Sequence, residues 1–84
     1  MKSLENDLKE GETLFAEGRF DEAEEFFLSV VEKDKNNKEA YNNIGVLAIQ
    51  KEDVKSAIEH FSRSLEIDPF YKTAFKNFTD LLKT

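Results

Sequence analysis

Few side chains in this sequence have the types and spacing that chemistry requires. His60 is the only histidine and there is no cysteine, so neither a multi-histidine metal site nor a thiolate site can be assembled. No serine or threonine stands in a nucleophile-elbow context, and no glycine-rich loop is present to hold phosphate. We therefore expect no enzymatic activity, no cofactor and no metal, and we interpret His60 as a surface residue.

The densest group of potential ligands is a set of carboxylates, namely Asp21, Glu22, Glu24 and Glu25. They lack the spacing and the glycine of a calcium-binding loop. At the start of a helix, carboxylates interact favourably with the positive end of the helix dipole. We interpret this group as a helix start and not as a cation site.

The composition indicates one small globular domain, 1–84, with 36% charged and 39% hydrophobic residues. There is no apolar run near the roughly 20 residues needed to cross a bilayer, and no signal-peptide pattern. The net charge of -6 disfavours nucleic acid and anionic membrane surfaces, which both attract lysine and arginine. The absence of cysteine fits a reducing compartment. We therefore expect a cytoplasmic protein that binds neither nucleic acid nor a membrane.

Apolar residues recur along the chain with the period of a helix. Examples are Ala23, Phe26, Phe27, Val30 and Val31, which fall on one face of a helix. The full pattern predicts five helices, near 4–17, 21–34, 38–50, 54–67 and 70–83.

Local signals predict where these helices begin and end. Gly18 can adopt the left-handed conformation that ends a helix. Asn36 and Glu39 have the spacing of a capping box at the start of the third helix. Asp68 followed by Pro69 suits an N-cap and a first helical residue, which predicts that the fifth helix begins there.

A fixed period of 34 residues relates two parts of the sequence, and such a period predicts a repeated structural unit. Its clearest pairs are Gly11 with Gly45, Ala23 with Ala57, and Phe27 with Phe61. Glycine inside a helix costs about 1 kcal/mol relative to alanine, so it needs a structural reason. We expect each glycine to face the small alanine of a second helix at a close crossing, with the phenylalanine beside it.

The second copy carries, in order, Tyr41, Ile44, Gly45, Ala48, Ala57, Phe61, Ser64 and Pro69. This order and spacing resembles the tetratricopeptide repeat, with full repeats at 4–37 and 38–71 and a partial third repeat or capping helix at 72–84. Glu52–Asp53 replaces the usual turn glycine of the second copy. The resemblance implies an all-α fold of antiparallel helix hairpins in a right-handed superhelix, whose first helices line a concave groove.

The resemblance also implies a function, the non-covalent capture of a peptide or helix of a partner protein in that groove. The residues that we predict to bind are Leu8, Glu12, Phe15, Asn42, Asn43, Val46, Ile49, Lys76 and Asn77. Further groove-facing positions are Glu5, Lys9, Glu39, Gln50, Thr73 and Asp80. Amides can bond to a peptide backbone, and apolar side chains offer area for burial. The alternatives are packing between first helices for Phe15, Val46 and Ile49, and simple solvation for Asn42 and Asn43.

One function of the family can be compared residue by residue. Its members that grip chaperone C-termini use a carboxylate clamp of lysine, asparagine and arginine side chains. The matching positions here hold Leu8, Glu12, Asn43, Thr73 and Asn77. Only Asn43 matches, and Glu12 would repel a carboxylate. This departure from the pattern disfavours the clamp function.

The last predicted helix is apolar at Phe75, Phe78 and Leu82, where an array that ends in water is usually polar. We therefore predict that this face self-associates in a homodimer or is covered by further residues; a slightly sticky monomer is the alternative. Two other functions stay open beside peptide capture. One is a structural or self-association module, and the other is a repeat segment of a larger enzyme such as a glycosyltransferase.

Overall fold

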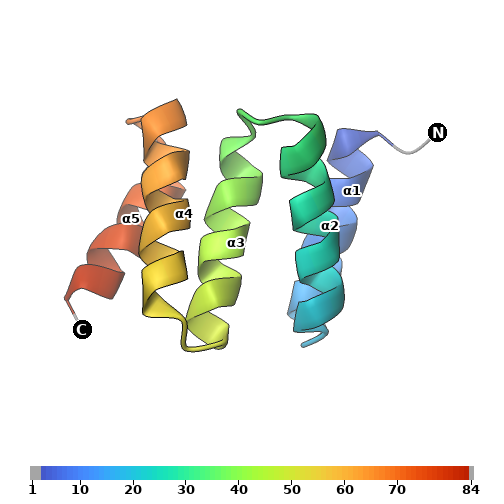
Figure 1. Ribbon diagram of the computed structural model, residues 1–84, viewed down its shortest axis with the longest axis horizontal. Coiled ribbons are helices and arrows are strands. Elements are labelled where there is room, and N and C mark those ends of the chain that lie inside the picture. The colour runs from blue at the N-terminus through green and yellow to red at the C-terminus, as the bar shows by residue number, and fades with distance from the viewer. Residues whose placement is uncertain (1–2, 84) are drawn as a thin grey trace.

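The computed structural model describes residues 3–83, which form five α-helices. The helices are α1 (Leu4–Ala16), α2 (Phe20–Lys33), α3 (Lys38–Gln50), α4 (Val54–Ile67) and α5 (Lys72–Leu82). Consecutive helices run in opposite directions, with α1 behind α2 and α5 behind α4 in the view of Figure 1. The predicted all-α array of helix hairpins is confirmed. Met1, Lys2 and Thr84, at the ends of the predicted domain, lie outside the described residues.

The turns inside the two hairpins share one geometry. Gly18, after α1, has a φ of +79°, and Glu52, after α3, has a φ of +61°. In each turn the next N–H donates to the carbonyl oxygen five residues earlier, over 2.9 Å and 2.8 Å. This left-handed cap ends each helix and reverses the chain. Glu52 thus adopts a conformation that favours glycine, at a cost of roughly 1–2 kcal/mol.

Helix α3 begins at Lys38, as predicted, but Asn36 is not its cap. Asn37 is the N-cap, and its Oδ1 accepts a hydrogen bond of 3.0 Å from the N–H of Ala40. The N–H of Asn36 donates instead to Oδ1 of Asp34 over 3.1 Å. The predicted pairing of Asn36 with Glu39 is therefore wrong, because Asp34 holds Asn36 in the preceding turn.

Helix α5 begins at Lys72, later than the predicted start near residue 70. Asp68 ends α4, and its Oδ1 accepts a hydrogen bond of 3.0 Å from the N–H of Phe70. The carbonyl oxygen of Asp68 accepts another, of 3.1 Å, from the N–H of Tyr71. These two bonds close a turn over Pro69. The prediction that Asp68 caps α5 is wrong, because its side chain holds this turn.

The ends of three helices are joined at Lys38, the first residue of α3. Its Nζ donates a hydrogen bond to Oδ2 of Asp68 and lies 4.9 Å from the centre of the Tyr71 ring. The buried Ser64 Oγ donates to the carbonyl oxygen of Lys38 over 2.9 Å. The bond from Lys38, followed by that from the N–H of Phe70, lowers the pKa of Asp68. These contacts fix the start of α5 against the second hairpin.

Each hairpin is closed by a phenylalanine ring that lies on a glycine. A Cβ atom at Gly11 would lie 2.5 Å from Cε1 of Phe27, and one at Gly45 would lie 2.6 Å from Cε1 of Phe61. Both rings are buried. The ring therefore occupies the space that the missing side chain leaves, and not the alanine that we predicted to face the glycine. The prediction of a close approach holds, with its partner corrected.

Two apolar clusters surround these rings. The first joins α1, α2 and α3, and consists of Leu14, Ala23, Phe27, Ile44 and Leu47. The second lies between α3 and α4 around Ala48, Ala57 and Phe61, and Phe78 and Leu81 of α5 pack against it. The clusters attach each hairpin to the next element, so the five helices form a continuous stack.

The odd-numbered helices lie on the inner side of this stack. Helix α1 contacts α3, and α3 contacts α5. In the described part of the chain, no contact joins α2 with α4. Because the odd-numbered helices approach one another and α2 and α4 do not, the stack curves toward α1, α3 and α5.

Gly45→Ala tests the contact between ring and glycine. We expect urea denaturation to show a free energy of unfolding up to about 2 kcal/mol lower. Overpacking of about 1–3 kcal/mol exceeds the gain of about 1 kcal/mol that alanine has over glycine in a helix.

Phe61→Leu is the control, because a smaller side chain makes room for the new Cβ. In that background Gly45→Ala should be neutral or stabilising by up to about 1 kcal/mol. Equal stabilisation by Gly45→Ala in both backgrounds would contradict the contact, since the effect would then be helix propensity alone.

Candidate binding surface

Three of the hollows in the described part of the chain are lined mainly by the odd-numbered helices, and together we call them the inner groove. The α1–α3 hollow, of about 70 Å³, is lined by Glu12, Phe15, Phe27, Asn43 and Val46. The α3–α5 hollow, of about 440 Å³, is lined by Ile49, Glu52, Val54, Asn77, Asp80 and Leu81. The N-terminal hollow, of about 510 Å³, is lined by Ser3, Leu4, Glu5, Leu8, Asp34, Asn37 and Glu39.

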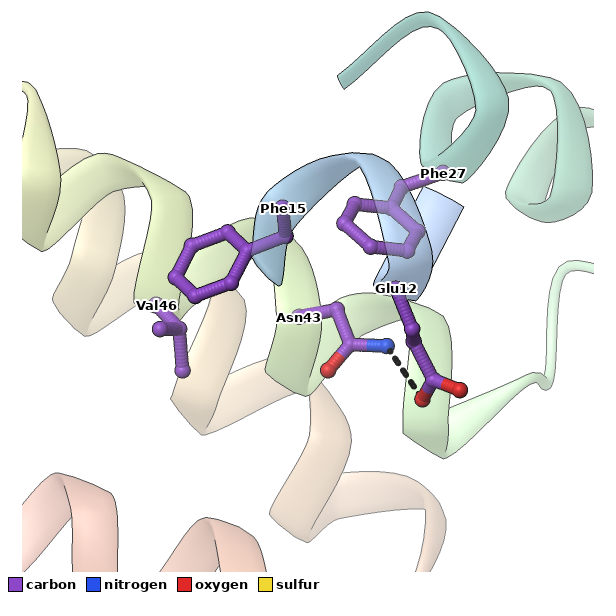
Figure 2. A pocket seen from close by; sticks show the side chains of 5 residues that line it. All are labelled: Glu12, Phe15, Phe27, Asn43 and Val46. Carbon is purple, nitrogen blue, oxygen red and sulfur yellow. Dashed lines mark hydrogen bonds between the residues drawn. The ribbon is translucent and has the colours of Figure 1, made fainter. Parts of the chain in front are cut away.

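The α1–α3 hollow combines apolar side chains with one amide. Figure 2 shows the Phe15 ring from α1 next to Val46 from α3, and Asn43 pointing toward Glu12. Nδ2 of Asn43 donates a hydrogen bond of 3.2 Å to Oε2 of Glu12. The Phe15 ring also packs on Phe20, with centroids 5.1 Å apart, so it is half-buried. The structure thus brings four of the predicted binding residues together.

Asn42 is not on this surface, contrary to the prediction. Only 4% of it is exposed, and its Oδ1 accepts a hydrogen bond of 3.0 Å from Nδ2 of Asn77. Asn77 itself is half-buried and lines the α3–α5 hollow. The prediction for Asn42 is therefore wrong. Helix α5 lies close enough for the side-chain amide of Asn77 to donate the hydrogen bond that we assigned to a ligand.

The remaining predicted residues lie at the two ends of the inner groove. Leu8 is half-buried in the N-terminal hollow, and Ile49 is 38% exposed in the α3–α5 hollow. Lys76 donates a hydrogen bond of 2.7 Å to Oδ2 of Asp80, one turn along α5. This bond lowers the pKa of Asp80. Lys76 is therefore paired with its own helix.

Several lining residues were missed by the sequence analysis because they lie outside the inner faces of the odd-numbered helices. Glu52 and Asp34 belong to turns, and Val54 begins α4. Only the 34-residue period offered a signal, since Glu52 corresponds to Gly18 and so to a tight turn beside the groove.

A second apolar region, the C-terminal edge, consists of Phe70, Phe75 and Leu82. Their exposed fractions are 89%, 57% and 61%. A hollow of about 330 Å³ lies here, lined by Pro69, Phe70, Lys72 and Phe75. Phe78, which we predicted on this face, is instead half-buried on the cluster around Phe61. Phe70 was missed because the sequence placed it inside a helix and the structure places it in a turn.

The side chains that first suggested chemistry have structural contacts. Nζ of Lys51 lies 2.9 Å from Oδ1 of Asp21 and 3.0 Å from Oε1 of Glu24. His60 is half-buried, with its ring stacked on Tyr41 and Nδ1 2.7 Å from the carbonyl oxygen of Ser56. Between residues 3 and 83, no three His, Cys, Asp or Glu side chains gather as a metal site would require. None of the described helices has the length and apolarity to cross a membrane.

Comparison with models of protein families matches residues 8–72 to the tetratricopeptide repeat. The matched range begins within α1, includes α2, α3 and α4, and reaches the first residue of α5. No curated protein matches the chain.

Asn42→Ala separates the buried amide from the groove amide. The substitution removes the hydrogen bond between the buried Asn42 and Asn77. We expect it to lower the free energy of unfolding, measured by urea denaturation, by about 1–3 kcal/mol. The matched control, Asn43→Ala, loses only an exposed bond and should stay within about 0.5 kcal/mol of the wild type. Equal losses for the two variants would argue against the α3–α5 pairing.

Proposed function

The chain belongs to the tetratricopeptide repeat family, whose repeats generally mediate protein–protein interaction, and from this premise we propose that it captures a segment of a partner protein in the inner groove. The observation that carries the proposal is the inner groove itself. Between α1, α3 and α5 it offers accessible apolar side chains beside amides, all positioned by packed helices.

The contacts available to such a segment are of two kinds. Phe15, Val46 and Ile49 are half-buried or exposed, so a ligand can remove apolar surface from water there. The amides of Asn43 and Asn77 can bond to the backbone of an extended segment or to polar side chains. Pockets of this mixed character are typical of binding sites, because apolar area gives affinity and a few polar groups fix orientation.

The proposed capture involves no covalent step. The family is typically a non-catalytic interaction module. Of residues 3–83, no lysine or arginine lines the three hollows, so this part of the chain supplies no cation there for a carboxylate clamp. The cytoplasmic location and the repeat boundaries 4–37, 38–71 and 72–84 stay predictions.

Peptides selected from a random library on the wild-type protein test this proposal. Titration with a selected peptide should shift the amide resonances of Asn43 and Val46 in NMR spectra. Val46→Asp should weaken binding about tenfold or more, which is about 1.4 kcal/mol, because a ligand would bury its charge without a partner.

Leu28→Asp is the control for this titration. Leu28 is an exposed apolar residue of α2, away from the inner groove, so the same substitution should leave affinity unchanged there. Equal weakening by both substitutions, or shifts confined to α2 and α4, would contradict capture in the inner groove.

The second candidate function is self-association through the C-terminal edge, favoured by the exposure of Phe75 and Leu82. These residues lie seven positions apart, two turns and about 10 Å along the same face of α5. Two antiparallel α5 helices would therefore set Phe75 of each copy against Leu82 of the other. Such a contact is self-complementary, as a two-fold dimer requires.

Sedimentation equilibrium tests the dimer over a range of protein concentrations. We expect the mass to rise with concentration from 9.7 kDa toward twice that value. Phe75→Glu should hold it at the monomer mass, since each contact would then bury a charge, and Leu28→Glu should behave like the wild type. A mass of 9.7 kDa at every concentration excludes this candidate.

A further inference from the structure

We infer that the segment captured in the inner groove is basic and amphipathic, with lysine or arginine at both ends of a short apolar stretch. This inference rests on the proposed function, because it names the chemistry of the partner for the same groove. It is carried by the distribution of charge over the three hollows, which differs from that of the rest of the molecule.

Among the residues that the structure describes, every charged residue that lines the three hollows is acidic. These residues are Glu12 in the α1–α3 hollow, Glu52 and Asp80 in the α3–α5 hollow, and Glu5, Asp34 and Glu39 in the N-terminal hollow. A concave surface lined by one sign of charge concentrates the electrostatic field and attracts ligands of the opposite sign. The surface therefore favours a cationic partner and disfavours an acidic one.

Within the described part of the chain, most of these carboxylates form no ion pair. Among residues 3–83, no ion pair involves Glu5, Glu39 or Glu52. Glu12 accepts a hydrogen bond from the neutral amide of Asn43, and Asp80 pairs with Lys76. The groove thus presents negative charge that an incoming segment can neutralise.

Three lysines pair with carboxylates outside the three hollows. Lys33 pairs with the buried Asp7, and Lys38 pairs with Asp68 at the ends of α3 and α4. Lys51 pairs with acidic residues of α2. These pairs join helices to one another, so Lys33, Lys38 and Lys51 contribute to the fold and do not neutralise the inner groove.

The spacing of the carboxylates limits the length of the segment. Glu39 lies in the first turn of α3 and Glu52 just beyond its end, so the two are about 20 Å apart at about 1.5 Å per residue. Phe15 and Val46 lie between these ends. An extended chain covers about 20 Å in about six residues. A matching segment has two cations about six positions apart, with apolar side chains between them.

Three synthetic peptides, acetylated and amidated, test the inference by NMR titration. The first is Lys-Ser-Leu-Ser-Leu-Ser-Lys, the second has glutamate in place of lysine, and the third has serine in place of lysine. We expect the lysine peptide to shift the amides of Asn43 and Val46 and to bind about tenfold or more tightly than the glutamate peptide. The difference should shrink at about 1 M salt, where the Debye length falls to about 3 Å.

Two triple variants with equal change in net charge give the matched control. Glu5→Gln, Glu39→Gln and Glu52→Gln together should weaken binding of the lysine peptide about tenfold. The outer set, Glu25→Gln, Glu32→Gln and Glu59→Gln, lies on α2 and α4 and should leave it unchanged.

The possible failures are distinguishable. If all three peptides shift the groove amides and bind with equal affinity, the charge inference is wrong and capture in the groove is still supported. Equal effects of the two triple variants lead to the same conclusion. If none of these peptides shifts the amides of Asn43 and Val46, the inference is wrong. If peptides selected from the random library also leave those amide resonances unshifted, the proposed function is wrong as well.

Discussion

The contact on which the structure depends is a phenylalanine ring lying where a glycine has no side chain. Gly11 receives Phe27 and Gly45 receives Phe61, 34 residues apart, and a Cβ at either glycine would overlap the ring. The contact joins the two helices of each hairpin, because the ring of the second helix lies on the glycine of the first. The other faces of α1 and α3 are then free to approach each other, and the inner groove is the surface that this arrangement leaves accessible.

Polar groups divide between holding the helices together and lining the groove. Asn42 bonds to Asn77 across α3 and α5, while its neighbour Asn43 stays at the surface one residue along. Lysines follow the same division, since Lys38 joins helix ends while Lys76 pairs with the groove residue Asp80. Residues adjacent in sequence thus have different roles because a helix turns each one toward a different neighbour.

The repeat period explains how much of this could be predicted from the sequence. Five helices follow from apolar periodicity, and α3 and α4 were predicted with their observed bounds. The start of α5 could not be predicted from the sequence, because the hydrogen bonds of Asp68 with Phe70 and Lys38 depend on which residues meet in the fold. The burial of Asn42 depends in the same way on how closely α5 approaches α3. The charge of the groove became visible only when turn residues such as Glu52 were placed beside it.

The central claim is that the inner groove, and not the C-terminal edge, holds a partner segment. Intermolecular nuclear Overhauser effects in a sample with the Lys-Ser-Leu-Ser-Leu-Ser-Lys peptide measure this directly. The account predicts contacts from the leucine methyl groups of the peptide to Phe15 and Val46. Contacts confined to Phe75 and Leu82 would contradict it.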